Sequence, residues 1–126
     1  MASEHHRRVL IVDDDADIRQ LLITAFRMKK LEVDAATNGQ EAMDLLRAQS
    51  YCVVLLDLFM PIMDGFAVLE QIHEDAMQPV VLVVTGADRK TIEKVDARRI
   101  HGIVKKPFDV EELASVVAAC AEARTM

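Results

Sequence analysis

The segment at residues 52–65, CVVLLDLFMPIMDG, contains the pattern that decides the fold. It begins with apolar residues that do not alternate with polar ones, as is typical of a strand buried between helices in a parallel sheet. The acidic residue Asp57 follows this run directly. Pro61 then marks a loop, and Gly65 permits the turn into the next helix. The segment therefore predicts a buried strand that ends at a carboxylate.

Apolar runs of the same kind recur along the chain, at residues 9–12, 31–36, 80–84 and 103–104. Apolar residues at helical spacing follow each run, near residues 18–25, 42–46, 66–72, 92–95 and 113–120. Asn38 and Asp109 each stand three residues before a glutamate, as helix-capping residues do. This alternation predicts an α/β fold in which five strands form a parallel sheet and five helices cover it.

The composition predicts one globular domain. The chain has 126 residues, of which 52% are hydrophobic, and its net charge of -6 opposes direct binding to nucleic acid. We assign residues 8–124 to the domain and residues 1–7, with His5 and His6, to a polar lead-in. No signal peptide or membrane-spanning run is expected, and Cys52 and Cys120 lack the spacing of a metal site. These features predict a cytoplasmic domain without membrane contact.

Polar residues stand where the predicted strands end. They are Asp13, Asp14 and Asp15 after the first strand, Asp57 after the third, Thr85 after the fourth, and Lys105 and Lys106 after the fifth. Since parallel strands bring their carboxyl ends to one edge of a sheet, we expect these side chains to converge. Converging carboxylates require a counter-ion, and a few oxygen ligands with room for water suit Mg²⁺ better than Ca²⁺ or Zn²⁺. Helix capping explains one of the consecutive aspartates, and Lys105 is interpreted as a solvated charge.

Four motifs resemble the receiver domains of two-component response regulators. In chain order they are VLIVDDDADIR, LLDLFMPIMDGF, VVTGA and KKPF, and together they extend over almost the whole chain. The resemblance implies a flavodoxin-like, doubly wound (βα)₅ sandwich with strand order 2-1-3-4-5. It also implies a cis peptide bond between Lys106 and Pro107, which would direct the lysine inward.

The resemblance implies a Mg²⁺ site and a phosphoacceptor. Asp57 matches the residue that accepts the phosphoryl group, and Asp14 matches a carboxylate that binds the ion directly. Asp13 would hold the ion through a water molecule. The backbone carbonyl of Phe59 matches the remaining protein ligand.

Three further positions match groups that would hold the phosphoryl oxygens. Thr85 would donate its hydroxyl, Lys106 would pair with an oxygen, and the backbone around Gly86 would donate hydrogen bonds while leaving space above Asp57. Catalysis would consist of positioning and charge neutralisation.

The implied function is a phosphorylation-controlled switch and not a turnover enzyme. The phosphoryl group would come from a phosphohistidine of a sensor histidine kinase or phosphotransfer protein, or from a small acyl phosphate. Ile18, Leu21 and Leu22 match the helix on which family members meet the phosphotransfer helices. The output would be a downstream protein effector or an output domain, reached by a monomer or by a phosphorylation-dependent dimer.

Three residues depart from the family pattern. Ile103 stands where an aromatic residue often swings inward on activation, so the output surface is expected to respond through the loops after strands four and five. Phe59 and Ala87 occupy positions that tune dephosphorylation, and neither side chain can orient a water molecule. Phe59 is also bulky enough to shield the phosphoryl group, so we expect slow hydrolysis.

Two other functions remain as alternatives. A haloacid-dehalogenase-type phosphohydrolase carries a D-x-D pattern after its first strand, which Asp13 to Asp15 match. Such enzymes usually need a longer chain and do not predict the MPIMDG segment. A phosphorylation-independent pseudo-receiver on the same scaffold is the second alternative, although such proteins usually lack an acid or the lysine.

Overall fold

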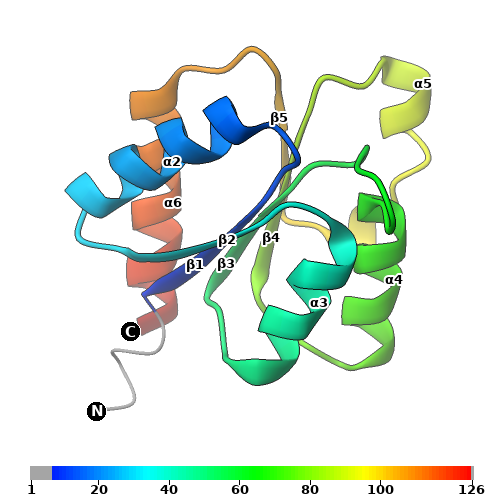
Figure 1. The fold of residues 1–126 in the computed structure, drawn as a ribbon, viewed down its shortest axis with the longest axis horizontal. Coiled ribbons are helices and arrows are strands. Elements are labelled where there is room, and N and C mark those ends of the chain that lie inside the picture. Colours follow the sequence, from blue (N-terminus) through cyan, green and yellow to red (C-terminus); the bar gives the residue numbers. More distant parts are fainter. Residues whose placement is uncertain (1–6, 126) are drawn as a thin grey trace.

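Five parallel strands form one sheet in the order β2-β1-β3-β4-β5 (Figure 1). The strands span Arg8–Val12 (β1), Glu32–Ala36 (β2), Val53–Leu56 (β3), Val80–Thr85 (β4) and Gly102–Lys105 (β5). The helices span Ala16–Met28 (α2), Gly39–Ala48 (α3), Gly65–Glu74 (α4), Arg89–Ile92 (α5) and Val110–Thr125 (α6), with a 3₁₀ helix at Ala97–Arg99 (η1). These bounds come from a computed structural model that describes residues 7–125, so His5 and His6 of the predicted lead-in lie outside the described residues. The strand order and direction confirm the predicted α/β fold.

Helices cover both faces of the sheet. Figure 1 shows α2 and α6 on one side and α3, α4 and α5 on the other. Along β1, Val9 and Ile11 pack in the core beneath α2 and α6, whereas Leu10 and Val12 pack in the core beneath α3 and α4. Successive strand residues point to opposite faces, and here both faces are buried. This arrangement explains why the strand sequences are apolar without alternation.

The helices begin at residues whose side chains accept backbone hydrogen bonds. Asn38 caps α3 by accepting from the Glu41 N–H at 2.9 Å, and Asp109 accepts from the Glu112 N–H at 2.9 Å. Asp15 caps α2 by accepting from the N–H groups of Asp17 and Ile18. These bonds satisfy donors that the first helical turn leaves free. Both predicted caps are therefore confirmed, and Asp15 is the consecutive aspartate that caps a helix.

The fourth helical segment is shorter than the sequence suggests. Apolar spacing around Ile92 and Val95 predicts a regular helix, but α5 has only 4 residues and η1 follows it with 3. Asp96 accepts from the Arg98 N–H at 3.0 Å and so starts a new turn in place of continuing α5. Aspartate competes for backbone hydrogen bonds in this way, which disfavours it inside helices.

Gly65 permits a close approach between α4 and the end of β3. Its N–H donates to the Leu58 carbonyl at 2.9 Å, and a Cβ at this position would overlap the Asp57 carbonyl oxygen. Only a glycine leaves enough space for the backbone of the loop after β3 to pack against the first turn of α4. Gly65 therefore helps to fix the backbone of Asp57.

We predict that Gly65→Ala lowers the free energy of unfolding by about 3 kcal/mol, because overpacking against a backbone atom forces the loop to move. Gly86→Ala is the matched control, since a Cβ there would lie 3.9 Å from the Lys106 Cβ in ordinary contact. Urea denaturation of both variants provides the measurement. Equal losses in the two variants would show that the contact with Asp57 does not matter.

Candidate functional site

Asp13 and Asp57 lie side by side at the carboxyl edge of the sheet. β1 and β3 are parallel neighbours in which Val12 pairs with Leu56, so each strand is followed by an aspartate at the same level. Both aspartates are buried, with exposed fractions of 3% for Asp13 and 7% for Asp57. The sheet register therefore brings two acidic side chains together where little water reaches them.

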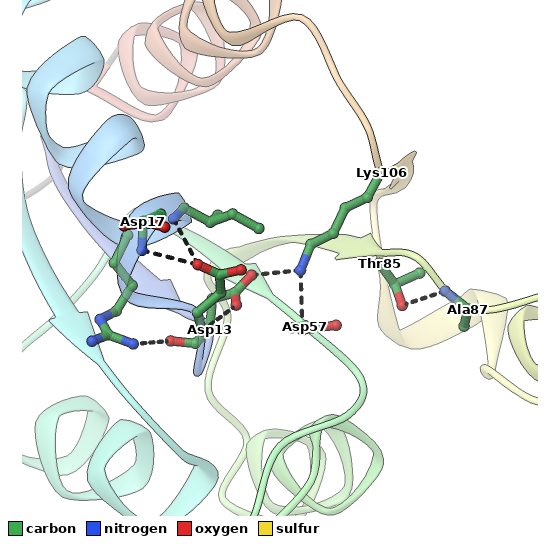
Figure 2. A network of polar contacts seen from close by, with 9 residues as sticks. Asp13, Asp17, Asp57, Thr85, Ala87 and Lys106 are labelled. Carbon is green, nitrogen blue, oxygen red and sulfur yellow. Dashed lines mark hydrogen bonds and ion pairs between the residues drawn. The ribbon is translucent and has the colours of Figure 1, made fainter.

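The ammonium group of Lys106 lies between these two carboxylates (Figure 2). Its Nζ is 2.8 Å from Asp13 Oδ2 and 3.2 Å from Asp57 Oδ2. Lys106 reaches the site because β5 is the neighbour of β4, and its backbone N–H donates to the Thr85 carbonyl at 2.9 Å. The Lys106–Pro107 bond is cis, as the resemblance implied. One cation thus offsets part of the repulsion between two buried acids.

The three charged groups shift one another's proton affinities. Burial raises the pKa of the Asp57 carboxyl above its ordinary value; Lys106 opposes this shift and Asp13 adds to it. Burial lowers the pKa of Lys106, but the bonds and charges of Asp13 and Asp57 outweigh this effect and raise it. Lys106 is therefore held in its charged form, while the folded protein favours the ionised form of Asp57 less than the unfolded chain does.

Three carboxylates form a set that fits a divalent cation. Carboxylate oxygens of Asp13, Asp14 and Asp57 lie within 4.8 Å of one another, and Asp14 is exposed. Hard oxygen ligands suit Mg²⁺, which also retains several waters, and the exposed side of Asp14 leaves room for them. Burial, with a smaller contribution from Asp13, raises the pKa of Asp57, and a bound cation would stabilise the ionised carboxylate against both effects. The residues present therefore fit the Mg²⁺ site, whereas the Phe59 carbonyl ligand stays a prediction.

Hydrogen bonds hold the Asp13 residue in place. Its Oδ1 accepts from the Asp15 N–H at 2.9 Å, and its backbone carbonyl accepts from Arg19 Nη1 at 2.8 Å. Arg19 was not among the site residues that the sequence predicted. A cation six residues after an aspartate has no distinctive spacing, and nothing in the sequence indicates that its side chain turns back toward β1. Arg19 is therefore a part of the site that only the structure identifies.

Thr85 and Gly86 lie on the same edge, next to Lys106. The Thr85 hydroxyl is fully buried and accepts a hydrogen bond from the Ala87 N–H at 3.1 Å (Figure 2). A Cβ at Gly86 would make only an ordinary contact with Lys106, so this position leaves open space. In this conformation the Thr85 hydroxyl thus bonds to its own loop and not to Asp57.

An apolar groove of about 370 Å³ lies beside the site. Its lining comes from α2 and from the chain after β5, and consists of Ile18, Leu21, Lys106, Pro107, Phe108 and Val110. Leu21 is 51% exposed, whereas Leu22 is 1% exposed and packs in the core beneath α2. Of the three residues predicted for partner contact, Leu22 is thus unavailable, since adjacent helix residues point in different directions.

The raised pKa of Asp57 predicts a stability effect. The pKa of Asp57 is higher in the folded protein than in the unfolded chain, where it has the ordinary value of 3.8. The folded protein therefore binds this proton more tightly, and the wild type loses stability as pH rises above 3.8. Asp57→Asn removes this ionisation. We expect the variant to melt at a higher temperature than the wild type at pH 7 without Mg²⁺, with the difference shrinking toward about pH 4. Thermal denaturation at both pH values is the measurement, and a variant that melts lower at pH 7 would contradict the prediction.

No helix within residues 7–125 is both long and apolar enough to cross a membrane.

Among proteins of known sequence, the chain is 34% identical over 120 residues to the regulatory protein AtoC of Escherichia coli. The match covers 94% of the chain and 26% of AtoC. The chain is 35% identical over 112 residues to the transcriptional regulatory protein SrrA of Staphylococcus aureus, covering 88% of the chain and 46% of SrrA. The chain therefore spans less than half the length of these curated relatives.

Solved receiver structures share the fold. The Francisella response regulator 1452 receiver domain superposes with a TM-score of 0.84 at 25% identity, covering 93% of this chain and 98% of that domain. The response regulator TrrA of Thermotoga maritima, solved in complex with Mg²⁺ and BeF, gives a TM-score of 0.79 at 28% identity, covering 90% of this chain and 97% of TrrA.

The sequence model of the response regulator receiver domain family matches residues 9–118 of this chain. This range includes Asp13, Asp14, Asp57, Thr85 and Lys106. Together with the parallel sheet and the acidic edge that Lys106 bridges, this match makes the chain a member of the receiver-domain family of two-component response regulators.

Proposed function

We propose that this chain accepts a phosphoryl group on Asp57 in the presence of Mg²⁺ and then changes conformation to control a partner. The receiver family is a family of signalling switches, and the alternative of a phosphohydrolase gains no support from the relatives. The observation that carries the proposal is the cluster of Asp13, Asp14 and Asp57 within 4.8 Å, with Lys106 bonded to two of its members.

In the proposed reaction, a carboxylate oxygen of Asp57 attacks the phosphorus atom of a phosphohistidine or a small acyl phosphate. The new O–P bond forms as the bond from phosphorus to the donor breaks, and the electron pair of that bond stays with the donor. Asp13, Asp14, Asp57 and the Phe59 carbonyl would hold Mg²⁺, which when bound neutralises charge on the phosphoryl oxygens. The remaining work of the site is to position the reacting groups.

Lys106 has two roles in this proposal. Before transfer, its ammonium bonds to Asp13 and Asp57 and so keeps the acceptor carboxylate in place. After transfer, the same ammonium is placed to pair with a phosphoryl oxygen, because that oxygen is attached to the Asp57 side chain it already contacts. Thr85 and the backbone at Gly86 would supply hydrogen bonds to the other oxygens.

We propose that the conformational signal begins at Thr85. The Thr85 hydroxyl oxygen now accepts from the Ala87 N–H at 3.1 Å, so if it moves toward Asp57 to donate its proton to the phosphoryl group, that movement would pull on the Ala87 backbone. Ala87 packs in the core together with Val95, so a shift of the Ala87 backbone would reach α5 and the segment after it. Ile103 is 40% exposed on the neighbouring strand and has no ring to swing inward. A signal through this backbone therefore replaces the aromatic movement common in the family.

The apolar groove beside Lys106 is the proposed contact site for the kinase or phosphotransfer protein. It adjoins the acceptor, and Leu21 exposes half of its surface there. The output remains either a separate protein effector or an output domain, as the lengths of AtoC and SrrA leave room for further domains in those relatives. We further propose that this domain acts in the cytoplasm without binding nucleic acid directly, as a monomer that dimerises only on phosphorylation.

The test of this function is incubation with acetyl phosphate and MgCl₂, followed by intact mass measurement. We expect the wild type to gain one phosphoryl group, and Asp57→Asn and an EDTA-treated sample to gain none, since the acceptor or the ion is then missing. Asp75→Asn is a matched control, because Asp75 lies at the end of α4 away from the acidic cluster. No gain in the wild type, also with a panel of histidine kinases, would contradict the proposal and leave a binding module.

We also expect the phosphorylated protein to hydrolyse slowly, because neither Phe59 nor Ala87 can orient a water molecule. Phe59→Asn should shorten the lifetime by about tenfold, since an amide can position the attacking water. Phe59 is the cleaner position because its side chain is 55% exposed, whereas Ala87 is buried at 7%. Decay of the phosphorylated mass after removal of acetyl phosphate gives the rate, with Phe59→Leu as the control of similar apolar bulk. Equal lifetimes of the wild type and Phe59→Asn would exclude this explanation.

A further inference from the structure

Arg19 on α2 is joined to the acidic site without contributing a ligand to it. Its Nη1 donates to the backbone carbonyl oxygen of Asp13 at 2.8 Å. Asp13 follows the last residue of β1, so its carbonyl lies beyond the paired part of the sheet. Among the described residues, the guanidinium of Arg19 is the group that bonds this oxygen. Arg19 thus supplies the hydrogen bond that a neighbouring strand would otherwise donate to this carbonyl.

The bond from Arg19 completes the support of Asp13. The Asp13 N–H donates to the Ala36 carbonyl at 3.2 Å, and the two carboxylate oxygens accept from the Asp15 N–H and from Lys106 Nζ. With these bonds, both the backbone and the side chain of Asp13 have fixed directions. The Asp13 carbonyl belongs to the peptide bond that joins Asp13 to Asp14. Its orientation therefore also affects the position of Asp14, and with it the arrangement of the three carboxylates of Asp13, Asp14 and Asp57.

The charge of Arg19 acts in the opposite direction from its hydrogen bond. The guanidinium is a cation near a cluster that is proposed to hold another cation, and like charges repel. Its charge also reaches Glu41 at the start of α3, whose pKa is lowered mainly by hydrogen bonds from Thr37 and to a smaller extent by Arg19. By Coulomb interaction alone, removing Arg19 would strengthen Mg²⁺ binding. By loss of positioning, removing it would weaken Mg²⁺ binding.

We infer that Arg19 is a positioning residue for the divalent cation, and that its hydrogen bond to the Asp13 carbonyl outweighs the repulsion of its charge. The inference rests on the proposed function, because it concerns the same Mg²⁺ site. Groups that orient metal ligands from outside the ligand set typically contribute 10- to 100-fold in metal affinity. The long side chain of Arg19 brings its Nη1 back to the Asp13 carbonyl, which lies before the first turn of α2.

The test is the Mg²⁺ dissociation constant of the unphosphorylated chain, measured by amide chemical-shift titration. Arg19→Met keeps an apolar chain of similar length and removes both the charge and the donor. We expect its binding of Mg²⁺ to be about tenfold weaker than that of the wild type. Arg27→Met is the matched control, since Arg27 is an exposed arginine on the same helix, and it should stay within about twofold because its charge is solvated.

The sign of the change decides between the two effects. Equal or tighter binding by Arg19→Met would overturn the inference, because charge removal would then account for the whole result. Melting temperatures without Mg²⁺ test whether the variant is folded, and if it is not, Arg19→Lys replaces it. Lysine keeps the charge and a donor but is shorter, so its ammonium does not reach the position of Arg19 Nη1. We expect about threefold weaker binding, and wild-type affinity would again overturn the inference. A wild type that does not bind Mg²⁺ would instead contradict the proposed function itself.

Discussion

The ion pair between Lys106 and the two buried aspartates is the interaction on which the rest of the site depends. Lys106 is 93 residues from Asp13 and 49 from Asp57 in the sequence, yet its Nζ bonds to both carboxylates. Without this cation, two nearly buried carboxylates would face each other with little water to separate their charges. The pair therefore makes it possible for the fold to keep two buried carboxylates together at one edge of the sheet, where we propose the phosphoacceptor and the Mg²⁺ site.

The parallel sheet delivers these groups through its register. Each of β1 and β3 ends one residue before an aspartate, and each is covered on both faces by apolar side chains. Because both faces of β1 and β3 are buried, a shift by one residue would turn each side chain toward the opposite, differently packed core, so close packing specifies the register. The close approach at Gly65 then holds the loop after β3 against α4. Core packing and site geometry are thus determined by the same contacts.

Hydrogen bonds and core contacts connect the site to helices α5 and α2 at the surface. Thr85 bonds to Ala87, and Ala87 packs in the core near the short helix α5, where Asp96 interrupts the helical segment. A one-turn helix has few internal hydrogen bonds, so it resists displacement less than a long helix does. On the other side, Arg19 ties the end of β1 to α2, which lines the apolar groove. Hydrogen bonds and core packing thus connect this edge of the sheet with α2 through Arg19 and with the segment before α5 through Ala87.

The sequence by itself determined the order of strands and helices, because buried strands and amphipathic helices differ in the periodicity of their apolar residues. It also determined that Asp13, Asp14, Asp57, Thr85 and Lys106 would gather, since each follows a strand and parallel strands end at one edge. Tertiary structure alone decided that Lys106 bonds to Asp13 as well as Asp57, that Arg19 turns back to the Asp13 carbonyl, that Thr85 bonds to Ala87, and that Leu22 is buried while Leu21 is exposed. The physical reason is that periodicity is a local property of the chain, whereas the direction of a side chain and its partners depend on which elements pack against it.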